Sequence, residues 1–189
     1  WEMIVEGCEH SAGANCYVNL ARIVDMSIHE QAEVERETGY FCEKIEKAES
    51  FEEVYRIIMD NIIRIIRRMC EIKRKHGRIF PQVSPSPFFS ACLSDCLKNR
   101  RDYTAGGGRY NPHGVPLANF ASLVDSLLAI NQICFINKSH SLSELLDAVR
   151  KDWKDCERLR AEALKSPHFG DNSEESNELA RHILDEIYD

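Results

Sequence analysis

The chain has 189 residues, enough to bury a core in one or two domains, and its 43% apolar content is that of an ordinary globular protein. The formal net charge of -7 argues against general binding to nucleic acid or to an anionic membrane, because both need a positive surface. No apolar run approaches the length of a membrane span, and the eight cysteines are better explained as free thiols in a reducing cytoplasm than as disulfides.

The N-terminal half predicts two helices. The first begins near Asn15 and carries apolar residues as far as Ile28. The second opens at Ser50, where Glu53 completes a capping box, and its apolar residues recur at helical spacing as far as Ile72. Basic residues crowd the C-terminal half of this helix. We interpret them as a solvated face that complements the helix dipole rather than as a phosphate or nucleic-acid site.

The middle of the chain predicts a more irregular region. Residues 77–87 are rich in proline and serine, which favours a break over a helix. A short helix then begins at Pro87 and extends through Leu97. Three consecutive glycines at 106–108 indicate a turn or a close approach of backbones, and residues 109–111 are expected to follow as a brief strand.

The C-terminal part predicts three further helices. The segment 117–136 is apolar nearly all round, which is typical of an internal helix. Ser141 and Glu144 form a second capping box that opens an amphipathic helix extending to Trp153. After a break, residues 171–174 are expected to cap the last helix.

Three segments carry a distinctive order of residues: Ser-Pro-Ser-Pro at 84–87, Gly-Gly-Gly-Arg-Tyr-Asn at 106–111 and Asp-Ser-Leu-Leu-Ala-Ile at 125–130. This order resembles the glycyl radical enzymes, the family around pyruvate formate-lyase and the related dehydratases, decarboxylases and lyases. The resemblance implies a helix-rich α/β chain that forms the later part of a ten-stranded α/β barrel. Residues 1–189 are then expected to be a single region within that partial barrel domain.

Gly7-Cys8-Glu9-His10 follows a strand-like start, where a loop can hold a side chain toward a pocket. In the family that this chain resembles, a cysteine here becomes a transient thiyl radical that takes a hydrogen atom from the substrate, while a nearby glutamate handles protons. The resemblance therefore implies that Cys8 is the radical residue. Glu9 adjoins Cys8 and His10 occupies the family's usual glutamate position, so proton transfer falls to one of these two residues.

Two other roles of Cys8 are less favoured. The negative charges of Glu6 and Glu9 keep the Cys8 thiol protonated, which suits hydrogen-atom transfer and disfavours the thiolate that a nucleophile requires. His10 leaves a nucleophilic role open, because an imidazole that folds back onto the sulfur is a base. The nucleophilic role ranks well below the radical residue, and also below a plain buried cysteine.

Other candidate residues give weaker signals. Tyr110 and Asn111 match strand residues of the family and are the expected substrate-binding residues. Because strand side chains alternate, at most one of them should approach the pocket. Cys92 and Cys96 are four apart, a spacing that can supply two metal ligands. No second pair lies at a matching spacing, so core packing is the better interpretation and no metal is expected.

The resemblance also implies the cofactor and the partner. The family stores its radical on a glycine in an Arg-Val-x-Gly-Tyr motif, which this chain does not contain, so we expect the glycyl radical outside the chain. A separate activating enzyme with an iron–sulfur cluster and S-adenosylmethionine would install it, in an anaerobic cytoplasm. The start at Trp1, without an initiator methionine, also indicates part of a longer polypeptide.

We therefore expect a fragment, inactive alone, of a glycyl radical enzyme that cleaves or forms a C–C, C–N, C–O or C–S bond in a small molecule. The alternative is a non-catalytic helical interaction or scaffold domain derived from that family. The sequence leaves the substrate and the formation of a homodimer open.

Overall fold

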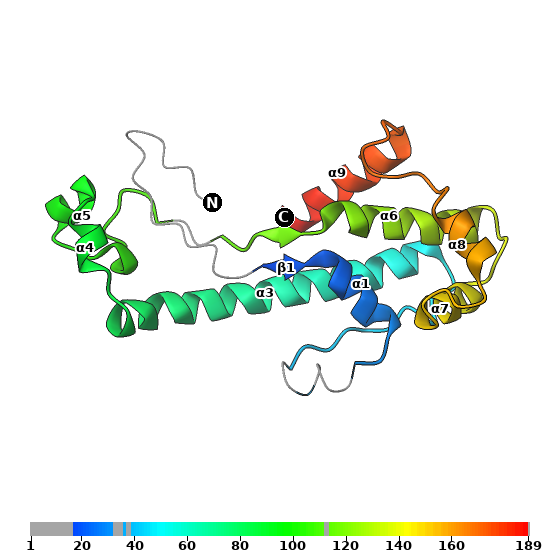
Figure 1. Ribbon diagram of the computed structural model, residues 1–189, viewed down its shortest axis with the longest axis horizontal. Coiled ribbons are helices and arrows are strands. Elements are labelled where there is room, and N and C mark those ends of the chain that lie inside the picture. The colour runs from blue at the N-terminus through cyan, green and yellow to red at the C-terminus, as the bar shows by residue number, and fades with distance from the viewer. Residues whose placement is uncertain (1–16, 32–35, 37–38, 112–113, 189) are drawn as a thin grey trace. The chain divides into compact units, whose positions relative to one another are not determined.

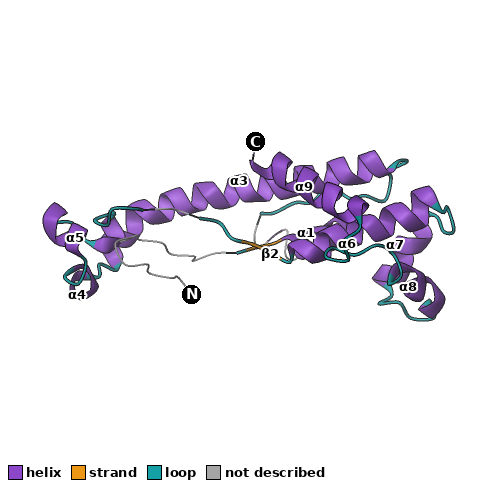
Figure 2. Ribbon diagram, turned by 90° about the horizontal axis from the view of Figure 1, so that it is seen from above, coloured by secondary structure: helices purple, strands orange, loops and turns teal. Residues whose placement is uncertain are grey.

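The computed structural model describes residues 17–31, 36, 39–111 and 114–188, which are mainly helical (Figures 1 and 2). Their α-helices are α1 (Leu20–Ile28), α3 (Phe51–Val83), α4 (Pro87–Ser90), α5 (Ser94–Asn99), α6 (Phe120–Ile130), α7 (Leu142–Arg150), α8 (Glu157–Ala163) and α9 (Glu174–Tyr188). A 3₁₀-helix, η1 (Tyr103–Ala105), and a π-helical segment, η2 (Asn131–Ile136), complete the helical elements. Two short strands, β1 (Val18–Asn19) and β2 (Leu117–Ala118), pair with each other. In this part of the chain no helix combines the length and apolarity needed to cross a membrane.

The chain divides into two compact units. Unit 1 comprises Trp1–Val18 and Ile66–Pro116, and unit 2 comprises Asn19–Ile65 and Leu117–Asp189. The helix α3 contributes its N-terminal part to unit 2 and its C-terminal part to unit 1.

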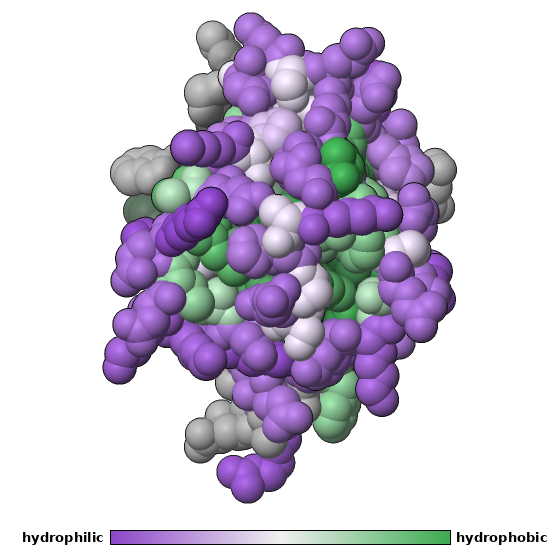
Figure 3. All heavy atoms as spheres, turned by 90° about the vertical axis from the view of Figure 1, so that its right-hand side faces the viewer, coloured by the Kyte–Doolittle hydropathy of each residue, from purple (hydrophilic) through white to green (hydrophobic). Residues whose placement is uncertain are grey.

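Unit 2 contains a hydrophobic core. Within it, α6 packs against both α1 and α9 (Figure 1). The largest fully buried side chains of the described residues all belong to this unit: Leu20, Ile45, Val54, Ile58, Met59, Ile62, Leu123, Leu127, Leu128, Ile133, Leu146 and Ile183. Each such side chain contributes about 1.5–3 kcal/mol by leaving water. The surface that carries α7 and α8 is mainly hydrophilic, with apolar patches visible between the polar residues (Figure 3).

Two cationic side chains close the C-terminal end of α1, where helix carbonyls lack partners within the helix. The Lys44 ammonium donates to the carbonyls of Met26 and His29 at 2.7 and 2.8 Å. The Arg150 guanidinium donates to the Ile28 carbonyl at 3.2 and 3.3 Å. Positive charge at this end also complements the helix dipole. These bonds attach the segment 39–48 and α7 to α1.

A buried amide on α3 fixes the segment that precedes this helix. Asn61 is fully buried, and its Oδ1 accepts a hydrogen bond from the Glu43 amide at 2.9 Å. Its Nδ2 donates to the Glu43 carbonyl and to the Ser27 hydroxyl, both at 2.9 Å. The Ser27 hydroxyl in turn donates to the Ile23 carbonyl at 2.8 Å. One side chain therefore connects α3, α1 and an irregular segment.

Several predicted helix starts are confirmed. Ser141 and Glu144 form both bonds of a capping box at the start of α7. At the start of α3 the Glu53 amide donates to the Ser50 hydroxyl at 3.2 Å, but the Glu53 carboxylate accepts from the Glu49 amide instead of the Ser50 amide. The internal helix predicted over 117–136 is present as α6 and η2, with β2 replacing its first residues.

Other predicted boundaries are wrong. The break over 77–87 begins late, because α3 continues through Pro81 to Val83. Since Pro81 lies in the last turn, its missing N–H removes a single hydrogen bond and the helix ends two residues later. The first helix begins at Leu20 instead of near residue 15, because Asn19 pairs in β1 and its side chain accepts the Arg22 amide as an N-cap.

Replacing Asn61 by leucine should lower the free energy of unfolding by about 2–4 kcal/mol, because the amide and carbonyl of Glu43 are left without their bonds to the Asn61 side chain. Urea denaturation measures this change. The neighbouring exposed residue provides the control, since Asp60→Ala should change stability by no more than about 0.5 kcal/mol. Equal effects of the two substitutions would contradict the role given to Asn61.

Candidate functional site

The Asp102 carboxylate organises the segment of unit 1 between α4 and the three glycines. It accepts the Ser86 amide at 3.1 Å and the Ser90 hydroxyl at 2.8 Å. It also accepts the amide and the hydroxyl of Thr104 at 2.9 and 2.6 Å. These bonds join the end of the Ser-Pro-Ser-Pro segment to the segment that enters the glycines. Ser86 precedes α4, and Pro87 occupies its first turn, where a proline loses no helical hydrogen bond.

The same hydrogen bonds set the protonation state of Asp102. Burial by itself would raise the pKa of Asp102, but the bonds from Thr104, Ser90 and Ser86 outweigh it and lower the pKa to about 2. Such a carboxylate is ionised at neutral pH and is a weak base. The cluster therefore suits positioning of the backbone and is a poor candidate for proton transfer.

Close packing of the backbone around position 107 leaves room for a glycine but not for a larger residue. A Cβ at this position would lie 2.1 Å from the Arg101 carbonyl oxygen and 2.9 Å from the Cys96 sulfur. The Gly107 carbonyl accepts the Asn99 side chain at 2.9 Å. Gly106 has a φ of +82°, in the left-handed region that glycine adopts without strain. The glycine motif thus lets the backbone turn directly against α5 and the residues that follow it.

Arg109, which follows the glycines, lies against α5. Its Nε is 3.3 Å from Oδ2 of Asp95, a mostly buried carboxylate. The Phe89 and Tyr103 rings meet edge to face with centroids 4.9 Å apart, which adds an aromatic contact between α4 and η1. Charge and aromatic contacts therefore supplement the Asp102 bonds.

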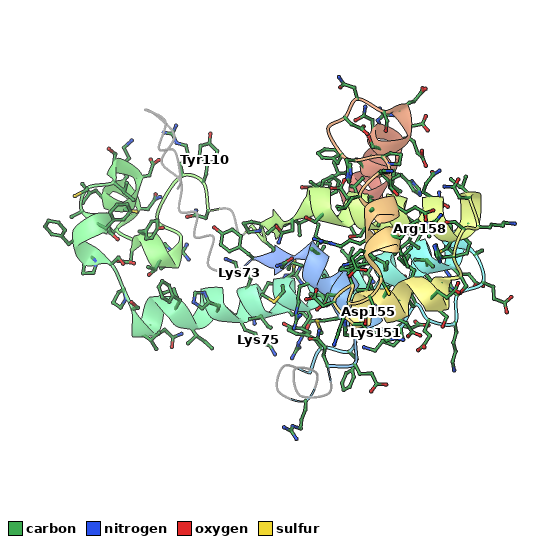
Figure 4. The ribbon with its side chains drawn as sticks, turned by 45° about the vertical axis from the view of Figure 1, so that its right-hand side comes forward. Lys73, Lys75, Tyr110, Lys151, Asp155 and Arg158 are labelled. Carbon is green, nitrogen blue, oxygen red and sulfur yellow. The ribbon has the colours of Figure 1, made fainter. Side chains whose placement is uncertain are left out.

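Tyr110 and Asn111 lie at the end of this loop. The Asn111 side chain donates to the Gly108 carbonyl at 2.7 Å, so its amide closes the turn. Tyr110 is 52% exposed and is labelled in Figure 4. The strand predicted over 109–111 is reduced to a single β-bridge at Tyr110. The assignment of these two residues to substrate binding stays a prediction.

The other predicted site residues have different outcomes. Cys8, Glu9 and His10 lie outside the described residues. Core packing is confirmed for Cys96, which is buried, but it is wrong for Cys92, which is exposed and donates to the Phe88 carbonyl at 3.5 Å. In the described ranges no cluster of three or more histidine, cysteine, aspartate or glutamate side chains suits a metal ion.

Asp102 is the residue of this site that the sequence analysis missed. The signal available was local, since an aspartate two residues before a threonine favours an Asx turn. Its bonds to Ser86 and Ser90, 16 and 12 residues away, have no periodic signature in the sequence.

The family model described as pyruvate formate lyase-like matches residues 3–189. The chain therefore belongs to this family. It is 26% identical to a (2S)-3-sulfopropanediol dehydratase from Klebsiella oxytoca, over 97% of this chain and 23% of that protein. It is 23% identical to a trans-4-hydroxy-L-proline dehydratase from Clostridioides difficile, over 91% and 22% of the two chains. The chain thus spans less than a quarter of the length of these curated relatives.

Solved structures show the same fold. The B12-independent glycerol dehydratase from Clostridium butyricum matches with a TM-score of 0.77 and 24% identity, over 95% of this chain and 23% of that one. A glycyl radical enzyme from Archaeoglobus fulgidus matches with a TM-score of 0.69 and 24% identity, over 90% and 22%. The expected fold, a helix-rich part of the glycyl radical enzyme barrel, is confirmed.

Substituting alanine for Gly107 should weaken the loop by about 3 kcal/mol, because the added methyl group overlaps the Arg101 carbonyl. Hydrogen exchange of the amides in residues 101–108 measures this local opening free energy. Gly114→Ala is the matched control, since nothing lies within 4 Å of its Cβ position, and it should leave these amides unchanged. Unchanged exchange in the Gly107 variant would contradict the close packing.

Asp102→Asn should lower stability at pH 7 by about 2 kcal/mol, because charged hydrogen bonds are lost. The folded pKa of about 2 lies below the ordinary value of 3.8, so the stabilisation is complete above about pH 4 and is lost as pH falls toward 2. Unfolding of both proteins across this pH range measures the effect. A difference that does not shrink below pH 4 would show that the charge of Asp102 is not its cause.

Proposed function

We propose that this chain is part of a glycyl radical enzyme that breaks or forms a C–C, C–N, C–O or C–S bond in a small molecule. The observation that carries the proposal is the family match over residues 3–189, a range that includes Cys8. The whole protein would act in an anaerobic cytoplasm, with a separate activating enzyme that uses S-adenosylmethionine.

Within this range of reactions, elimination is the class with the most support. Two relatives are dehydratases, and a third, from Oleidesulfovibrio alaskensis, is an isethionate sulfite-lyase with 25% identity. Loss of water breaks a C–O bond and loss of sulfite breaks a C–S bond. We therefore assign the whole protein to the dehydratase and lyase branch.

In this proposal Cys8 exchanges hydrogen atoms with the substrate. The Cys8 thiol would first lose its own hydrogen atom to the glycyl radical outside this chain. The resulting sulfur radical would then take a hydrogen atom from a substrate C–H bond, so that the S–H bond forms again and the unpaired electron is left on the substrate carbon. After the leaving group has departed with a proton from Glu9 or His10, the Cys8 thiol would return the hydrogen atom to the product radical, and the unpaired electron would return to the sulfur. The glycyl radical, on a glycine outside this chain, supplies the unpaired electron.

The described loop would present Tyr110 to the substrate. Of the two residues expected to bind substrate, Asn111 uses its amide to bond the Gly108 carbonyl, whereas Tyr110 is half exposed. The Asp102 bonds would hold the loop in place, so that less conformational freedom is lost when a substrate binds.

The alternative is a helical scaffold domain that keeps the family's packing without its chemistry. The feature that favours it is His10, which stands at the family's usual glutamate position. A scaffold would carry no glycyl radical after activation. An enzyme would carry one.

Cys8→Ala in the full-length protein should abolish turnover after anaerobic activation and leave the glycyl radical signal intact, because the substitution removes only the sulfur that reaches the substrate. Electron paramagnetic resonance and a product assay measure the two effects. Cys92→Ala, which changes an exposed thiol, is the control and should keep full turnover.

Normal turnover of the Cys8→Ala variant would overturn the assignment of the site. A wild-type protein without any radical signal after activation would favour the scaffold instead.

A further inference from the structure

The loop between α8 and α9 is fastened to α6 by one carboxylate and one aromatic contact (Figure 1). Asp125, in the second turn of α6, accepts the Phe169 amide at 2.7 Å through Oδ1, and its Oδ2 lies 3.6 Å from Nδ1 of His168. The Phe169 ring meets the Phe120 ring edge to face, with centroids 5.6 Å apart. His168 and Phe169 therefore form a strap against the first two turns of α6.

A second carboxylate braces the strap from within the loop. Asp171 accepts the His168 amide at 3.0 Å and the Ser173 amide at 2.8 Å. The Ser176 hydroxyl, in the first turn of α9, donates to the same carboxylate at 3.3 Å. The bond from the His168 amide, followed by those from the two serines, holds the pKa of Asp171 below its ordinary value. The strap is thus joined to α9 through a carboxylate that is ionised at neutral pH.

The His168 imidazole lies between two oxygen atoms that only accept hydrogen bonds. Its Nε2 is 3.0 Å from the Leu164 carbonyl, at the C-terminal end of α8, and its Nδ1 is within ion-pair distance of the Asp125 carboxylate. A neutral ring that donates from Nε2 turns the lone pair of Nδ1 toward that carboxylate. An imidazolium presents an N–H group to both oxygens. The geometry therefore favours the protonated ring.

The charges around the ring act in the same direction. The Leu164 carbonyl has the largest effect on the pKa of His168, and the charges of Asp125 and Asp171 add to it, so that the pKa is raised above its ordinary value of 6.5 although burial opposes the shift. Lys165, the nearest basic residue along the chain, is exposed, so water screens its charge. The His168 side chain is 45% exposed, which lets it exchange protons with the solvent.

We propose that the strap is a proton-controlled fastener, in which protonation of His168 closes the loop between α8 and α9 onto Asp125 and deprotonation releases it. Because the folded pKa of His168 is raised, this stabilisation is complete below the unfolded value of 6.5 and is lost as the pH rises through the folded value. Release frees the Phe169 ring and uncovers Phe120, the first residue of α6. The inference goes beyond the proposed function and requires no radical chemistry.

Hydrogen exchange of the full-length protein tests the proposal. Peptide mass spectrometry follows the amides of residues 166–172 at about pH 5.5 and about pH 8.5, and each rate is divided by the intrinsic rate at that pH. Protection should be about 2- to 5-fold greater at the lower pH, the range that an exposed ion pair provides. The amides of residues 123–128 in α6 are the internal reference, because a general change in stability would alter them as well.

Three variants assign the effect to the strap. His168→Gln cannot gain a proton, so its protection should be the same at both pH values and equal to that of the wild type at the higher pH. Asp125→Asn keeps an acceptor for the Phe169 amide but removes the charge that faces the imidazole, so the pH dependence should shrink. His76→Gln, in α3, is the matched control and should keep the wild-type dependence.

Three results would overturn the proposal. The first is wild-type protection of residues 166–172 that is equal at the two pH values or increases with pH. The second is a His168→Gln variant that keeps the wild-type dependence. The third is an equal change in residues 123–128, which would assign the effect to the stability of the whole unit.

Discussion

The hydrogen bonds to the Asp102 carboxylate connect two motifs that are 16 residues apart, the Ser-Pro-Ser-Pro segment and the approach to the three glycines. Much of unit 1 depends on this connection. Gly107 packs against the Arg101 carbonyl next to Asp102, and Tyr110 follows the same turn. A single ionised side chain thus sets the path of a loop that the family resemblance singles out.

The two units are stabilised by different physical means. Unit 2 has an apolar core, to which α1, α6 and α9 contribute. Its buried Asn61 adds hydrogen bonds to the irregular backbone segment around Glu43. The described part of unit 1 is instead stabilised by the hydrogen bonds of the Asp102 carboxylate, the ion pair of Arg109 with Asp95 and the close packing of Gly107. Most of its large apolar side chains are exposed. Such a unit gains most when other polypeptide covers it.

The sequence predicted the elements that local rules specify. The capping box at Ser141 and the internal helix around Leu127 depend on near neighbours and on periodicity, and both are present. The predicted break failed at Pro81, because this proline lies in the last turn of α3, where its missing N–H removes a single hydrogen bond. The role of Asp102 was not predicted, because its hydrogen-bond partners Ser86 and Ser90 are distant along the chain. Cys8, the centre of the chemical hypothesis, lies outside the described residues.

The closure of α1 has a consequence for the order of folding. Its last carbonyls are held by Lys44 and by Arg150, and Arg150 lies 122 positions beyond the Ile28 carbonyl that it bonds. Contacts between such distant residues form late, because a long loop must first be closed. During synthesis the Arg150 bond to α1 therefore forms only after α7 has left the ribosome, whereas Lys44, which is closer along the chain, can bond the Met26 and His29 carbonyls earlier.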